Sequence, residues 1–172
     1  DLFLSDGEFN YEFSDGSPVL YPRDVYENMT NGELSLDYYE DSLLQYILLS
    51  QIKQRGDINA PLESTASKRH KNRFANFVQD IQGLTLDIGS DMPSISCKLL
   101  PESCDYLGLD PYAGSGEYRV IGLGEILPFS DSKFDAVLFN TSLDHILDYH
   151  TSIDEAYRVL KPGGSIIIAS YA

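Results

Sequence analysis

The chain has 172 residues, of which 42% are apolar, and this suits one globular domain with an appendage better than two full domains. Twelve basic and 27 acidic side chains give a net charge of −15, which argues against nucleic acid or an anionic membrane as a partner held by bulk charge. No apolar run approaches the roughly 20 residues of a membrane span, and no signal peptide is visible, so a cytoplasmic protein is expected. Cys97 and Cys104 match no metal or redox spacing, and no metal is predicted.

The first 64 residues are expected to form an N-terminal arm and an amphipathic helix. Asp-Gly and Ser-Pro pairs within residues 1–27 favour a short hairpin or an extended arm. From Thr30 to Lys53, apolar residues recur at steps of three and four, which predicts one long helix. A second helix, ending at Gly83, is predicted from an apolar stripe formed by Phe74, Phe77, Val78 and Ile81.

Residues 65–172 are expected to form the main domain, which is of the α/β class. Short apolar runs separated by turns and helical pieces predict five buried parallel strands, at 84–88, 106–109, 118–121, 136–140 and 165–169. Before the last strand, Ser152 and Glu155 suggest a helix-capping box, and residues 161–164 (Lys-Pro-Gly-Gly) are expected to end that helix. The pattern predicts a doubly wound, Rossmann-like parallel sheet with N-terminal helices and the 84–88 strand at its centre.

Chemistry is expected at the carboxyl ends of these strands, where doubly wound sheets bind their ligands. The first strand ends in Asp87 and Gly89, and a glycine there lets the backbone approach a ligand closely. The second strand ends in Asp110, which is placed to accept hydrogen bonds from both hydroxyls of a ribose. These residues favour an adenosine-containing ligand.

Four segments resemble the class I S-adenosylmethionine-dependent methyltransferases (methyltransferase type 11-like), and the resemblance covers about residues 70–172. They are Leu-Asp-Ile-Gly at 86–89, Gly-Leu-Asp at 108–110, Gly-Glu-Ile-Leu-Pro-Phe at 124–129 followed by Phe-Asp at 134–135, and Arg-Val-Leu-Lys-Pro-Gly-Gly at 158–164. Nicotinamide-binding folds share the first two, whereas the last two are specific. The resemblance implies a transferase with S-adenosyl-L-methionine as its cofactor.

The resemblance also implies a role for individual residues. Asp87, Gly89 and Ser90 would line the methionine end, and Asp110 would hold the ribose. Asn140 would offer its backbone carbonyl to the methionine ammonium. The adenine would be flanked by Pro111 and Tyr112 on one side and, on the other, by Gly124, Glu125 and Ile126.

Methyl transfer is an in-line displacement on an activated carbon, so holding the two reactants in line can account for most of the catalysis. A base is needed only where the acceptor must lose a proton. His145 follows the fourth strand and, in the layout of the family, would face the methyl group. A structural or merely solvated histidine is the alternative.

Three departures from the family pattern concern the cofactor and the chain end. Asp91 and Pro93 stand where the family has glycines, and Leu123 replaces an acid that commonly reads the adenine amino group. The Asp91 charge is expected to oppose the cofactor carboxylate, so Asp91→Gly should tighten binding. The family's last two strands and helix are missing after Ala172, so a missing segment or a protein partner is expected to cover the apolar edge 165–169.

The expected function is S-adenosylmethionine-dependent methyl transfer to a small-molecule or sugar acceptor, without nucleic acid or membrane as a partner. The alternative is a catalytically silent, methyltransferase-like binding or scaffold module. A nucleotide-binding oxidoreductase is disfavoured because the chain lacks the G-x-G-x-x-G pattern.

Overall fold

The computed structural model describes residues 2–4, 12–14, 17–19, 65–90, 95–111, 119–146 and 148–170. The predicted helix from Thr30 to Lys53 lies outside the described residues, as do Asp91, Pro93 and Tyr112. Among the described helices, none combines the length and the apolar character needed to cross a bilayer.

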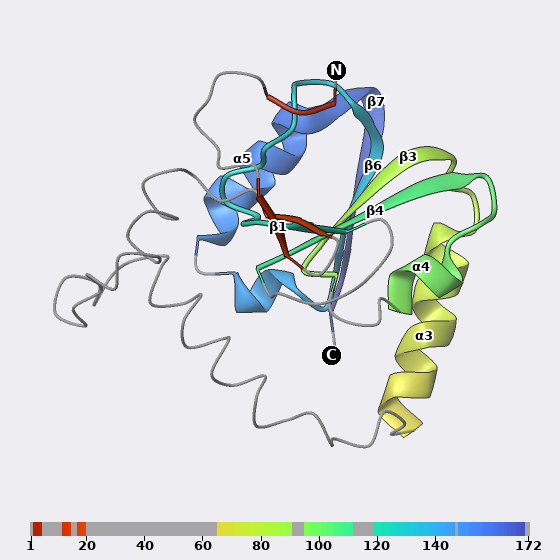
Figure 1. Ribbon diagram of the computed structural model, residues 1–172. Coiled ribbons are helices and arrows are strands. Elements are labelled where there is room, and N and C mark those ends of the chain that lie inside the picture. The colour runs from red at the N-terminus through yellow and green to blue at the C-terminus, as the bar shows by residue number, and fades with distance from the viewer. Residues whose placement is uncertain are drawn as a thin grey trace, which may run out of the picture.

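In the described part of the chain, seven strands form one sheet in the order β1-β2-β5-β4-β3-β6-β7 (Figure 1). Their bounds, in chain order, are β1 Glu12–Ser14, β2 Ser17–Val19, β3 Gly83–Ile88, β4 Cys104–Asp110, β5 Arg119–Ile121, β6 Phe134–Asn140 and β7 Leu160–Ala169. The pairs β5–β4, β4–β3, β3–β6 and β6–β7 are all parallel. The predicted parallel α/β sheet is therefore confirmed, and the 84–88 strand is central, since β3 stands in the middle of the run β5-β4-β3-β6-β7.

Helices cover both faces of the sheet (Figure 1). Helices α3 (Thr65–Val78) and α4 (Ile95–Leu99) lie on one side, and α5 (Tyr149–Val159) lies on the other. Successive side chains of a strand point to opposite faces, so β6 supplies both cores. On the α3 side, Leu138 packs with Phe74 and Val78. On the α5 side, the core includes Leu86, Ile88, Val137, Phe139, Ala156 and Val159.

The expected capping box of α5 is wrong. Asp148 caps this helix, since its side chain accepts a hydrogen bond from the Thr151 amide. Ser152 is instead fully buried inside the helix, and Glu155 uses its carboxylate elsewhere, on the Leu127 amide. The helix ends at Val159, so residues 161–164 belong to β7 and do not form the turn that stops the helix.

The end of helix α3 also differs from the prediction. Helix α3 stops at Val78, and Gly83 opens β3 with a φ of +80°. A β-carbon at Gly83 would overlap the Asp135 carboxylate, so glycine is required here for a close approach and not as a helix cap.

The N-terminal arm contributes to the sheet. Strands β1 and β2 pair antiparallel, which confirms the hairpin expected within residues 1–27. Strand β2 then pairs parallel with β5 through Val19 and Ile121, and Phe3 forms an isolated antiparallel bridge with Phe129. The sequence offered no signal for either contact, and the division at residues 64 and 65 stays a prediction.

Asp135 ties three neighbouring strands together. Its carboxylate accepts a hydrogen bond from the Leu84 amide at 2.9 Å and pairs with Lys161 Nζ at 2.8 Å. The hydrogen bond from Lys161 lowers the pKa of Asp135. Partial burial acts in the opposite direction, and the hydrogen bond from the Leu84 amide lowers this pKa further. Asp135 itself lies within β6.

This geometry predicts an acid-sensitive contribution to stability. Because the folded pKa lies below the unfolded one, the contribution is present above the unfolded pKa and is lost as the pH falls through the folded pKa. We expect the free energy of unfolding of Lys161→Met to fall less steeply than that of the parent chain below about pH 4. The difference should be at most about 0.5 kcal/mol, because the pair is partly exposed and screened. Urea unfolding across a pH series measures it, with Lys98→Met as the charge-matched control; equal slopes for Lys161→Met and the parent chain would contradict the prediction.

Candidate functional site

The strand register brings the predicted acids to one edge of the sheet. Asp87 of β3 pairs with Gly108, and Asp110 is the last residue of β4, two positions further along. Both carboxyl side chains are buried, with relative exposures of 1% for Asp87 and 3% for Asp110. Carboxylate oxygens accept hydrogen bonds, so this edge is suited to a ligand with hydroxyl or amine donors.

Tyr106 orients the Asp87 carboxylate. The tyrosine hydroxyl donates a hydrogen bond to Asp87 Oδ2 at 3.0 Å from the adjacent strand. Sequence reasoning missed this residue, because the contact joins positions 19 residues apart and depends on the pairing register of β3 and β4.

The turn after β3 requires glycine and is anchored on both sides. Gly89 has a φ of +75°, and a β-carbon there would overlap that of Ser142. The amides of Gly89 and Ser90 both donate to the Leu109 carbonyl, at 2.8 and 3.2 Å. Ser142 donates its hydroxyl to the Ile88 carbonyl at 2.5 Å. The turn is thus held close to the ends of β4 and β6.

Asn140 links the site to both helices of the α3 side. Its side-chain oxygen lies 2.7 Å from His70 Nε2 on α3, and its side-chain amide donates to Ser96 Oγ on α4 at 3.1 Å. Its backbone carbonyl accepts the Thr141 hydroxyl at 2.6 Å. The resemblance assigned only this carbonyl, so the role of the carboxamide in joining β6, α3 and α4 is an addition from the structure.

The loop after β5 lies tightly against the carboxyl end of β3. Gly122 donates its amide to the Asp110 carbonyl at 3.1 Å. A β-carbon at Gly124 would lie 2.8 Å from both Ile88 Cγ2 and Ser152 Oγ. Glu125 is buried, whereas Ile126 is 38% exposed. Leu123 is 2% exposed and belongs to the interior of the protein.

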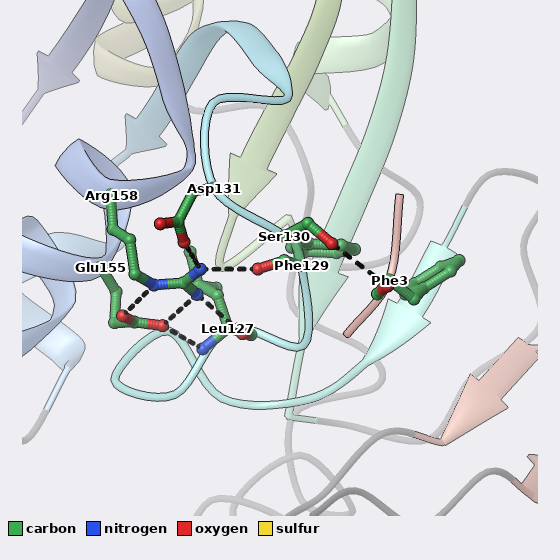
Figure 2. A network of polar contacts seen from close by, with 7 residues as sticks. All are labelled: Phe3, Leu127, Phe129, Ser130, Asp131, Glu155 and Arg158. Carbon is green, nitrogen blue, oxygen red and sulfur yellow. Dashed lines mark hydrogen bonds and ion pairs between the residues drawn. The ribbon is translucent and has the colours of Figure 1, made fainter. Parts of the chain in front are cut away.

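A charged network, shown in Figure 2, holds the second half of this loop. The Arg158 guanidinium donates to the Leu127 carbonyl at 3.0 Å and to the Phe129 carbonyl at 2.7 Å. Glu155 accepts from the Leu127 amide at 2.8 Å and from Arg158 Nε at 2.6 Å. The hydrogen bond to Glu155 raises the pKa of Arg158. Partial burial acts in the opposite direction, and the Asp131 carboxylate adds to the increase. The Arg158 guanidinium therefore stays charged and fixes the backbone of the loop.

His145 lies in the short 3-10 helix η2 (Leu143–His145) that follows β6. Its Nε2 lies 4.0 Å from Asp144 Oδ2, and both side chains are about 70% exposed. The histidine is therefore near the expected edge, but the described contacts do not hold its ring in one orientation.

The predicted site residues differ in how close they lie to this edge of the sheet. Asp87, Gly89, Ser90, Asp110 and Asn140 lie at the ends of three neighbouring strands, and Gly124 reaches the same edge through Ile88. Pro111 directly follows Asp110, whereas His145 lies on the exposed η2 turn. The cofactor-binding and catalytic roles of all these residues stay predictions.

Comparison with known proteins finds similarity to methyltransferases over the same part of the chain. Residues 86–168 match a family model described as a methyltransferase domain. A demethylmenaquinone methyltransferase of Corynebacterium glutamicum is 41% identical over 54 residues, which cover 31% of this chain and 24% of that protein. A chicken mitochondrial 2-methoxy-6-polyprenyl-1,4-benzoquinol methylase is 29% identical over 106 residues, covering 62% of this chain and 32% of that protein.

A solved structure extends the comparison to the fold. A candidate S-adenosyl-L-methionine-dependent methyltransferase from Methanococcus maripaludis superposes with a TM-score of 0.50 at 22% identity, over 62% of this chain and 58% of that one. The fold is thus shared. The two enzymes named above are matched over about a third of their length or less, so the match concerns one part of such proteins.

Proposed function

We propose, from the premise that residues 86–168 of this chain belong to the class I S-adenosylmethionine-dependent methyltransferase family, that the chain transfers a methyl group from S-adenosylmethionine to a small organic acceptor. The observation that carries the proposal is Asp110, a buried carboxylate at the end of β4. Asp110 lies beside the turn at Gly89, where a β-carbon would overlap Ser142, so that only glycine fits.

The residues present fit the cofactor. Gly89, Gly108 and Gly124 all lie where a β-carbon would overlap a neighbouring atom, which for Gly108 and Gly124 would be 2.7 and 2.8 Å away. Each glycine thereby lets a neighbouring side chain pack closely around the ends of β3 and β4, where an adenosine and a methionine chain have to be enclosed. Asp110 supplies the acceptor that two ribose hydroxyls need.

The residues divide the work of holding the reactants. Asp110 would accept hydrogen bonds from the ribose, and the turn formed by Gly89 and Ser90, with Asp87 behind it, would enclose the methionine end. Asn140 would bind the ammonium through its backbone carbonyl. Pro111, Tyr112, Gly124, Glu125 and Ile126 would surround the adenine. S-adenosylmethionine, when bound, supplies an activated methyl group, so these residues act chiefly by orienting and by excluding water.

The acceptor is proposed to be a quinol-type ring in preference to a sugar. The names of two relatives refer to a menaquinone precursor and a benzoquinol, which supports an aromatic acceptor. A ring hydroxyl must lose its proton during transfer, and His145 Nε2 is the proposed base for that case. If a ring carbon accepts the methyl group, the proton leaves from that carbon and another group would have to take it. His145 would then be a solvated residue.

A catalytically silent module is not favoured, because the family match extends over all three strand ends of the site. A further segment of chain or a protein partner would cover the outer edge of β7. Among the described strands, β7 is the last of the sheet on this side, and its residue Ile168 is 52% exposed.

The test has two stages. Calorimetric titration with S-adenosylmethionine and with S-adenosylhomocysteine asks whether the chain binds the cofactor. Transfer of a labelled methyl group to a reduced naphthoquinone, a reduced benzoquinone and a sugar then asks for the acceptor. Cofactor binding followed by labelling of a quinol supports the proposal. Binding with no transfer to any acceptor supports the silent module, and no binding rejects the proposal.

A further inference from the structure

The residues at the start of the described chain pack onto the end of the loop after β5. The Leu4 amide donates to the Pro128 carbonyl at 3.0 Å, and the Ser130 amide donates to the Leu2 carbonyl at 2.9 Å. The Ser130 hydroxyl also donates to the Phe3 carbonyl at 3.2 Å, as Figure 2 shows. The rings of Phe3 and Phe129 lie 5.4 Å apart, and Phe129 is fully buried.

The same N-terminal part of the chain reaches the other end of this loop. Strand β2 pairs with β5 at Val19 and Ile121, and Ile121 is the residue directly before the loop begins. Residues 2–4 and 17–19, which we call the N-terminal clamp, therefore contact Ile121, directly before the segment 122–130, and the last residues of that segment. Between these contacts lie Gly124, Glu125 and Ile126, the residues assigned to the adenine.

Arg158 and Glu155 hold the loop at the same place through different groups. They bind the amide and carbonyl of Leu127 and the carbonyl of Phe129, whereas the N-terminal clamp binds the carbonyl of Pro128 and the amide of Ser130. Backbone groups along 127–130 are thus fixed alternately by α5 and by the clamp. The two sets of contacts therefore involve different backbone groups of the loop, and neither set replaces the other.

We propose that the N-terminal clamp is a positioning element for the cofactor, because it holds the strand that enters the loop closing over the adenine and the residues that end this loop. This inference rests on the proposed function for its ligand. A loop that is already ordered loses less conformational entropy when the cofactor binds, so the clamp should tighten binding without touching the cofactor. Residues 2–4 and 17–19 lie outside the part of the chain that matches the methyltransferase family, 86–168.

The test combines hydrogen exchange with cofactor binding on the full chain. The double variant Phe3→Ala, Ser130→Ala removes the ring contact and the side-chain hydrogen bond. We expect amide exchange in peptides covering 122–130 to rise about tenfold, while peptides covering β3 and β6 stay unchanged. The Kd for S-adenosylhomocysteine should rise about fivefold to tenfold. Ser130→Thr, which keeps a hydroxyl, should restore most of the affinity lost in Ser130→Ala.

Two single variants serve as matched controls. Phe77→Ala removes a phenylalanine that is 77% exposed on α3, and Ser103→Ala removes a similar hydroxyl-to-carbonyl bond, to Ile81 at 3.3 Å. Neither should change loop exchange or the Kd. The proposal is overturned if loop exchange stays at the parent rate in the double variant, or if exchange rises while the Kd does not. A parent chain that binds no S-adenosylhomocysteine rejects the proposed function instead, and loop exchange alone then decides whether the clamp orders the loop.

Discussion

An Asp110→Ala protein is expected to bind S-adenosylmethionine and S-adenosylhomocysteine about 100-fold more weakly than the parent chain, or to lose binding. Asp110 is 3% exposed at the end of β4, and its carboxylate is the proposed partner of both ribose hydroxyls. Each charge-assisted hydrogen bond contributes about 1.5 to 3 kcal/mol. Losing two therefore costs at least about 3 kcal/mol, which corresponds to about 100-fold in Kd.

Calorimetric titration measures this effect, and two variants sharpen it. Asp105→Ala removes the same charge from an exposed position of the same strand and should leave the Kd unchanged. Asp110→Asn keeps the shape of the side chain but lacks the charge, so it should bind at an intermediate affinity. Parent-like affinity in Asp110→Ala, with an unchanged circular dichroism spectrum, would remove Asp110 from the site.

Arg158→Met is expected to lower the free energy of unfolding by about 3 kcal/mol, because it leaves two carbonyls without their donor and removes the cation that pairs with the largely buried Glu155 carboxylate. The Arg158 side chain is 27% exposed and that of Glu155 is 20% exposed, so water can replace the lost partners only in part. The guanidinium has a fork geometry that serves two carbonyls and a carboxylate together. Arg158→Lys, with a single point of charge, should recover only part of the loss.

Urea unfolding checks this expectation, and Lys161→Met provides the comparison. Lys161 and Asp135 also form an ion pair, but their side chains are 44% and 35% exposed. Its removal should cost at most about 0.5 kcal/mol at neutral pH. A double-mutant cycle with Glu155→Gln separates the ion pair from the carbonyl contacts. If Arg158→Met costs no more than Lys161→Met, the network does not stabilise the loop.

The sequence alone was sufficient for the elements whose signal is local. Buried parallel strands form short apolar runs, and a run such as 84–88 carries that signal within a few residues, so strand positions and their parallel arrangement could be predicted. The site acids follow from the same argument, since parallel strands that share an orientation bring their carboxyl ends to one edge. Asp87 and Asp110 are assigned to that edge by this reasoning, and the register of β3 and β4 agrees with it.

The tertiary structure decided what depends on pairing between distant residues. The Ser130–Phe3 hydrogen bond joins positions 127 apart, and no local pattern encodes it. Glu155 has the spacing of a capping box with Ser152, yet its carboxylate goes to Leu127, 28 positions away, because Asp148 already caps α5 and Arg158 lies one turn along. A charged side chain takes the partner that folding brings nearest, and only the packed chain determines which partner that is.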